Sequence, residues 1–147
     1  MRRKFLWINF VLASLIVVLV FVQAYLITAY VTGAGEGALD AHGIVGGLFI
    51  HASELLVFLT AFGAWPRNWR WIGYTFFLFF FGTVQIFLSP PDDADDRASG
   101  WVHGLHGGFA LIVAVLAATI AYRGMKDLGL RRGRGGGEDA APAQPLP

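Results

Sequence analysis

The most constraining feature of this chain is the apolar run over residues 5–31, which contains no charged residue. An α-helix needs about 20 apolar residues to cross about 30 Å of hydrocarbon. Because lipid offers no hydrogen-bond partners, a helix must satisfy its own backbone groups. A secretory signal peptide is the alternative, but its apolar region spans only about 7–15 residues. We therefore predict a retained transmembrane helix over residues 5–31.

Three further apolar stretches follow, over residues 41–65, 69–88 and 101–122. Composition agrees with a membrane location, since 14% of the residues are charged against about 25% in soluble domains. We predict an all-α integral membrane four-helix bundle over residues 1–132. Three glycines argue for a loop at residues 32–41, and the acidic residues 89–100 are predicted to form a second loop. Residues 133–147, rich in Gly, Ala and Pro, are predicted to be a disordered cytoplasmic tail.

The charges are segregated along the chain, and this predicts the orientation of the bundle. All eleven lysines and arginines except Arg97 fall on one side of the predicted membrane. Cytoplasmic loops carry the excess of basic residues, so both termini are predicted to lie in the cytoplasm. We expect a multi-pass protein of the cell membrane, namely a bacterial inner membrane. The basic segments suit membrane anchors and not a nucleic-acid surface, so the predicted partners are the lipid bilayer, other membrane helices or a redox partner.

An internal repeat links the two halves of the predicted bundle. Residues 42–50 read HGIVGGLFI and residues 103–112 read HGLHGGFALI, sharing the frame His-Gly-x-x-Gly-Gly-apolar. Upstream, Gln23 precedes His42 by 19 residues, and Gln85 precedes His103 by 18. Two matched features at matched spacing predict a duplicated helical hairpin. Gln23 and Gln85 are predicted to form hydrogen bonds between helices or to support a ligand.

Three histidines fall near the outer ends of the second and fourth spans: His42, His103 and His106. Imidazoles from two helices can ligate one b-type haem from opposite faces, with His42 and either His106 or His103 on the iron. Beside them lie two GxxxG pairs: Gly43 with Gly47, and Gly104 with Gly108. Such pairs let helices approach closely, and they also leave room for a flat cofactor. The alternative is a cofactor-free structural or accessory subunit, with partly solvated histidines and glycines that pack against other helices.

His51 and Glu54 form a second constellation, three residues apart on one face of the second span. Their distance from His42 places them near the bilayer centre, where ionisable groups are costly and suggest function. They are predicted to form either a proton or ion pathway or a hydrogen-bonded pair that ties helices together. His51 follows His42 by nine residues, which puts the two on opposite sides of an α-helix.

Several chemistries have no support in the sequence. The chain contains no cysteine, which excludes disulfides, thiolate metal sites and covalent haem attachment. It has no nucleotide-binding glycine loop, no HExxH motif and no Ser-His-Asp candidate, so we name no catalytic residue and do not expect an enzyme. The acidic residues 92–96 lack the EF-hand frame and are predicted to be a solvated loop.

At its histidine repeat, over about residues 10–122, the chain resembles one half of the haem A synthase family. Those proteins resemble two fused four-helix bundles with haem-ligating histidines near the outer ends of the second and fourth helices, here His42 and His106 or His103. The Gln-x-x-Leu pattern that begins at Gln23 and at Gln85 is also similar. The resemblance implies one haem between the second and fourth helices.

The same region is similar to small uncharacterised bacterial four-helix membrane proteins whose last helix begins Leu-His-x-x-x-Ala-Leu, here residues 105–111. The chain departs from the synthase pattern at two positions. Leu39 stands where the family has a Glu three residues before the His, and Gly43 stands where an Arg commonly follows it. With one half present and these residues changed, the resemblance implies haem binding and not the hydroxylation of haem.

Overall fold

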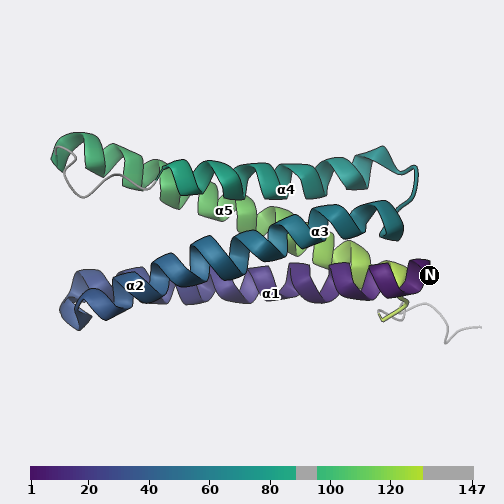
Figure 1. Ribbon diagram of the computed structural model, residues 1–147, viewed down its shortest axis with the longest axis horizontal. Helices are drawn as coiled ribbons and strands as arrows, with labels where there is room; N and C mark the ends of the chain where they lie inside the picture. Colours follow the sequence, from purple (N-terminus) through teal and green to yellow (C-terminus); the bar gives the residue numbers. More distant parts are fainter. Residues whose placement is uncertain (89–95, 131–147) are drawn as a thin grey trace, which may run out of the picture.

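The computed structural model describes residues 1–88 and 96–130, which are helical apart from short turns (Figure 1). The elements in chain order are α1 (Arg2–Ala29), a π-helical turn η1 (Tyr30–Ala34), α2 (Glu36–Ile44), a π-helical segment η2 (Val45–Ile50), α3 (His51–Ala64), α4 (Trp69–Phe87) and α5 (Asp96–Asp127). Because α2, η2 and α3 continue into one another, the described chain forms four long helices. The predicted all-α class is confirmed.

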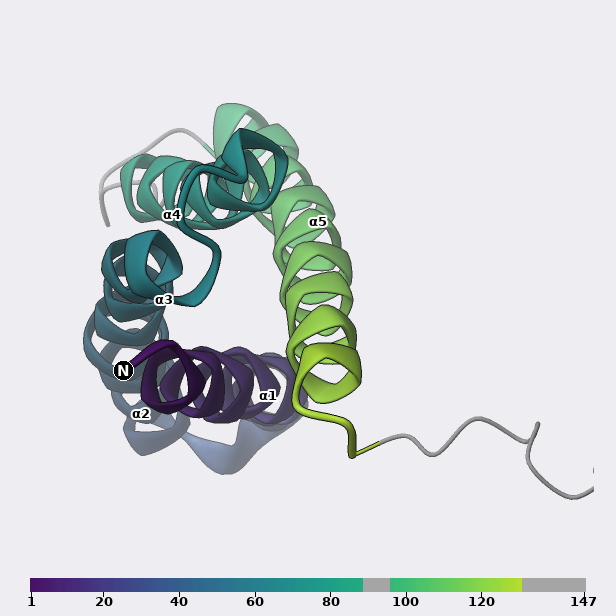
Figure 2. The ribbon, with the colours of Figure 1, turned by 90° about the vertical axis from the view of Figure 1, so that its right-hand side faces the viewer.

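The four helices form a ring around a common axis (Figure 2). α1 contacts α3 and α5, and α4 contacts the same two helices on their other side. The N-terminus, the α3–α4 turn and the last turn of α5 gather at one end of the bundle (Figure 1). We call this the closed end. The opposite end, which holds the α1–α2 turn and the beginning of α5, is called the open end.

Three of the described helices are long and apolar enough to cross a membrane: Arg2–Ala34, Glu36–Ala64 and Gly100–Asp127. Three of the four predicted spans are therefore confirmed as candidates by length and composition. α4 has 19 residues but is not in this group, and its most hydrophilic residues are Arg70 and Gln85. A membrane crossing by α4 stays a prediction.

The half of the bundle toward the closed end holds most of the core. Ala13, Ala61 and Ala117 are fully buried on three different helices, and Ile16 and Leu78 fill the space between them. Small residues let helix backbones approach closely, which maximises van der Waals contact where lipid provides no hydrophobic driving force. The small residues therefore hold the helices together in this half.

Polar contacts reinforce the closed half. Asn9 of α1 is fully buried, and its Nδ2 donates to the backbone oxygen of Val57 at 2.7 Å and to Thr60 Oγ1 at 3.0 Å. These bonds tie α1 to α3 at a depth where an unsatisfied amide would be costly. The sequence showed Asn9 only as a polar residue in an apolar run.

Asp127, in the last turn of α5, joins that helix to the α3–α4 turn. Its Oδ2 accepts hydrogen bonds from Trp65 Nε1 at 2.8 Å and from Arg123 Nε at 2.9 Å. The Arg123 guanidinium also lies 5.0 Å from the ring centre of Trp71, in cation–π geometry. The carboxylate therefore links α5 to the α3–α4 turn, and Arg123 adds the contact to α4.

Two predicted boundaries were wrong. The predicted loop at residues 32–41 is shorter, because the turn is completed by Gly33 and Gly35, with φ of 99° and 86°. Once the chain has turned there, α2 begins at Glu36, where an acidic residue suits the positive end of the helix dipole. α5 runs from Asp96 to Asp127 and not over residues 101–122, since carboxylates also favour a helix beginning.

Other predictions fall on residues outside the described ranges. These are most of the acidic loop, residues 89–95, and the C-terminal tail, residues 133–147. The basic residues Arg131, Arg132 and Arg134 lie outside as well.

We predict that Asp127→Ala lowers the free energy of unfolding by about 1–2 kcal/mol, because it removes the acceptor of two side-chain hydrogen bonds. Thermal or denaturant unfolding in detergent micelles measures the effect. Lys126→Ala is the matched control, since Lys126 is the exposed neighbour of Asp127, and it should change stability by less than about 0.5 kcal/mol. Equal effects of the two variants would contradict the role given to Asp127.

Candidate functional site

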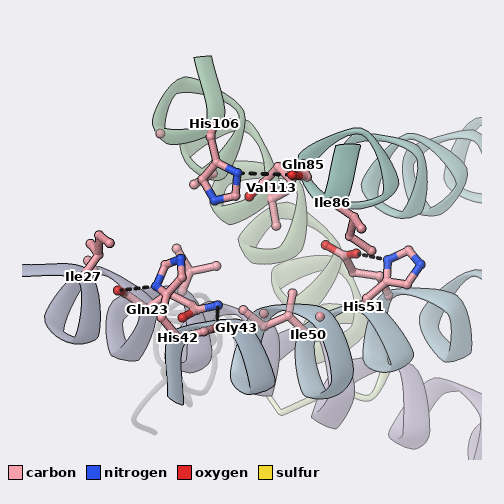
Figure 3. Close-up of a pocket in the computed structure, with 18 of the residues that line it drawn as sticks. Gln23, Ile27, His42, Gly43, Ile50, His51, Gln85, Ile86, His106 and Val113 are labelled. Atoms are coloured by element: carbon pink, nitrogen blue, oxygen red, sulfur yellow. Dashed lines mark hydrogen bonds and ion pairs between the residues drawn. The ribbon is translucent and has the colours of Figure 1, made fainter. Parts of the chain in front are cut away.

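A cavity of about 470 Å³ lies between the helices on the open-end side of the core (Figure 3). All four long helices contribute to its lining. Its polar side chains are Gln23, His42, His51, Glu54, Gln85 and His106, and its glycines are Gly43, Gly46, Gly47, Gly82 and Gly107. The remaining lining is aliphatic. This combination of an apolar wall and a few convergent polar groups is typical of a ligand site.

His42 and His106 are held in the same way on opposite sides of the cavity. Nδ1 of His42 lies 3.3 Å from the backbone oxygen of Gln23, and Nδ1 of His106 lies 3.2 Å from the backbone oxygen of Gln85. A carbonyl oxygen only accepts, so each Nδ1 carries the proton and donates it. Each Nε2 therefore keeps its lone pair, the tautomer found in histidines that bind metals.

The two imidazoles face one another across the cavity (Figure 3). Their ring centres are 6.2 Å apart and their planes are inclined by 47°. A metal ion held between two imidazoles has metal–nitrogen bonds of about 2 Å, and each nitrogen lies about 1 Å from its ring centre, so the ring centres would be about 6 Å apart. The spacing of His42 and His106 thus fits two axial ligands of one ion.

Gln23 joins α1 to α2 beside this pair. Its Nε2 donates to the backbone oxygen of His42 at 2.9 Å, so the predicted hydrogen bond between helices is present. A Cβ built on Gly46 would overlap the Gln23 amide, so a larger residue there would displace that amide from its hydrogen bond. Oε1 of Gln23 is buried and has no hydrogen-bond partner among the described residues.

Glu54 is the most deeply buried ionisable group at the cavity, with 1% of its surface exposed. Its Oε2 lies 3.3 Å from Nδ1 of His51, so the predicted pairing of these residues is present. The His51 ring stacks on Phe79, with ring centres 5.1 Å apart. A Cβ built on Gly82 would overlap the Glu54 carboxylate. Oε1 of Glu54 is buried without a partner in the described chain.

The sequence prediction that His42 and His51 lie on opposite sides of their helix was wrong, since both line the cavity. The reason is the π-helical segment η2, Val45–Ile50, which lies between them. Its i→i+5 hydrogen bonds make wider turns and rotate the residues that follow relative to an unbroken α-helix. Such segments are frequent at functional sites, and nothing in the hydrophobic pattern revealed this one.

The structure brings only part of the predicted cofactor site together. His42, His106, Gly43 and Gly47 line the cavity, whereas His103, Gly104 and Gly108 are not among its lining residues. His103 and His106 are three residues apart, so helical periodicity places both on the same face. The sequence therefore did not show which of them would line the cavity.

The predicted close packing at the GxxxG pairs is not seen within the described chain. A Cβ built on Gly43, Gly47, Gly104 or Gly108 meets no atom within 4 Å. The pairs lie where the helices diverge toward the open end. Close approach occurs instead at four glycines that sequence reasoning did not single out for it: Gly46, Gly63, Gly82 and Gly124.

The described residues do not form a site for a bare metal ion. Across residues 1–88 and 96–130, no three His, Cys, Asp or Glu side chains gather as possible metal ligands. Zn²⁺ sites use three or four protein ligands. The facing pair of His42 and His106 supplies two imidazole nitrogens.

No family model, curated protein or solved structure matches this chain. Any ligand assigned to the cavity therefore rests on the residues that line it.

We predict that Gly82→Ala destabilises the protein by about 1–3 kcal/mol relative to Gly73→Ala, because the new methyl group displaces a buried carboxylate. Gly73 lies on the same helix, but a Cβ built there meets nothing within 4 Å. Gly73→Ala should be neutral or stabilising by up to about 1 kcal/mol through helix propensity. Unfolding in detergent compares the two. If both variants are equally stable, the Glu54 side chain moves without cost and the close approach is unimportant.

Proposed function

We propose that this small integral membrane protein binds one b-type haem between α2 and α5, with His42 and His106 as axial ligands. It would act in electron transfer or in holding haem. The main support for this proposal is the facing pair of imidazoles, whose ring centres are 6.2 Å apart. A backbone carbonyl fixes each ring, so that Nε2 is the free ligand atom. When bound, haem supplies one-electron redox chemistry.

The chain's own residues have separate roles in this proposal. Gln23 and Gln85 hold the two rings through their backbone oxygens and so fix the tautomer and orientation of each ligand. Gly43 and Gly47 leave room beside His42, where any larger side chain would enter the cavity. The cavity volume of about 470 Å³ falls within the range of about 300–1,000 Å³ found for small-molecule sites.

The proposed ligand pair agrees with the resemblance to one half of the haem A synthase family. The proposal uses His106 and not His103 as the second ligand because, of these two histidines, His106 lines the cavity, and its ring faces His42. The matched Gln–His contacts, one in each hairpin, also support the proposed duplication, with His106 and not His103 as the counterpart of His42.

A second candidate function, a cofactor-free accessory subunit, is favoured by one observation. Gly104 and Gly108 lie exposed on α5, and a Cβ built on either meets nothing within 4 Å. Exposed small residues at this spacing suit close contact with a helix of another membrane protein. This function requires no ligand between His42 and His106, so the two candidates differ in their absorption spectra.

We also propose that α4 crosses the membrane with the other three helices and that both termini lie in the cytoplasm. The closed end carries seven of the eight basic residues of the described chain: Arg2, Arg3, Lys4, Arg67, Arg70, Arg123 and Lys126. The eighth, Arg97, belongs to the first turn of α5 at the open end. Glu36 and Asp40 lie near the open end. An excess of basic residues on the cytoplasmic side supports this orientation.

Single cysteines test the orientation cleanly, because the chain has none of its own. We expect Glu36→Cys to react with a membrane-impermeant maleimide added to intact cells. Asn68→Cys, in the α3–α4 turn, should react only after the membrane is permeabilised. Reaction of Asn68→Cys in intact cells would show that the orientation is the opposite one. Equal protection of both variants would contradict a membrane crossing by the second span.

The haem proposal is tested by absorption spectra of the full chain, purified in mild detergent from haem-replete cells. We expect a Soret band, with sharp α and β bands after reduction by dithionite. His42→Ala and His106→Ala should each lose these low-spin bands, because one axial ligand is missing. His103→Ala, which changes a histidine outside the cavity, should keep them. A colourless wild-type protein would reject haem binding in favour of the accessory subunit.

A further inference from the structure

Glu54 is a buried acid that the proposed haem ligation does not use. Its side chain lines the same cavity as His42 and His106. Glu54 belongs to α3, which leads from α2 toward the closed end, and its partner His51 is visible in Figure 3. Oε2 faces His51, and Oε1 has no hydrogen-bond partner among the described residues. An ionisable group at this depth in a membrane span is costly and by default indicates a function.

The helices packed around the cavity offer Glu54 little positive charge. α1 and α4 contribute only uncharged side chains to the described lining, including Gln23 and Gln85. α2 contributes His42 and α5 contributes His106, and both rings are tied to backbone oxygens. On α3 itself His51 is the one titratable neighbour. Glu54 is thus the only acidic side chain that lines the described cavity.

The oxidation state of a bound haem would change the amount of positive charge near Glu54. With two neutral imidazole ligands, ferric iron in a porphyrin dianion leaves one net positive charge, and ferrous iron leaves none. An ionised carboxylate in a low-dielectric interior is stabilised by a nearby positive charge and becomes costly when that charge is lost. The charge on Glu54 is therefore coupled to the charge on the iron.

We propose that Glu54 takes up one proton when haem iron between His42 and His106 accepts one electron, and releases it on oxidation. The inference rests on the proposed haem function. The electron would come from an external one-electron donor and would reduce bound ferric iron to the ferrous state. A proton from water forms an O–H bond to the carboxylate, so one electron and one proton enter together. His51, held by Phe79, positions the carboxylate.

The test is a redox titration of the full haem-bound protein in detergent at a series of pH values. Because reduction takes up a proton, the midpoint potential of the wild type should fall as the pH rises. For one proton per electron, a tenfold change in proton concentration shifts the potential by about 59 mV. Glu54→Gln, which keeps the shape without the titration, should lose most of this slope and have the higher potential at alkaline pH.

Glu36→Gln is the matched control, since Glu36 is an exposed carboxylate on the same continuous helix, and it should keep the wild-type slope. An unchanged slope in haem-bound Glu54→Gln would overturn the inference while leaving haem binding in place. A wild type without a Soret band would instead remove the proposed function itself.

A second measurement is decided by the wild type, so its outcome does not depend on whether a variant folds. The infrared difference spectrum between reduced and oxidised wild type should contain the C=O band of a newly protonated carboxylic acid. Glu54→Asp, which keeps an acid, should retain a shifted band. A wild-type spectrum without any protonated-carboxyl signal would overturn the proposal, whatever the stability of Glu54→Gln.

Discussion

Close packing of small residues in the closed half of the bundle is the interaction on which the rest of the structure depends. Ala13, Ala61 and Ala117 bring helix backbones together there, and Asn9 and Asp127 add hydrogen bonds between helices. From this closed end the helices separate toward the open end (Figure 1). The cavity lies between them on that side of the core.

The polar groups of the cavity differ in how far their hydrogen bonds are satisfied. A membrane interior penalises unsatisfied polar atoms, yet Gln23 and Glu54 each leave a buried oxygen without a partner in the described chain, as Asn9 does in the closed half. By contrast, both histidines are fixed by backbone oxygens. Gln85 lies in the last turn of α4, where its carbonyl oxygen accepts from the backbone N–H of Leu88 at 3.1 Å and also from His106.

Much of this architecture could be predicted from the sequence. Apolar runs predicted four membrane spans, of which three are candidates in the structure, and the GxxxG pattern drew attention to the region that contains His42 and His106. The pattern predicted the wrong contacts, however. Gly104 and Gly108 face open space, whereas Gly46 and Gly82 accommodate Gln23 and Glu54. Spacing along a helix shows which glycines share a face, but not which face meets a neighbour.

The sequence by itself determined a helical membrane protein, because apolar runs in lipid have to satisfy their backbone groups internally. It also predicted that histidines would lie near the ends of two helices, and the structure has both of these ends at the open end of the bundle. Only the tertiary structure decided that His106 and not His103 faces His42, and that η2 turns His51 toward the same cavity. Periodicity fixes relative positions on one helix, whereas the rotation of one helix against another is set by side-chain packing across all four.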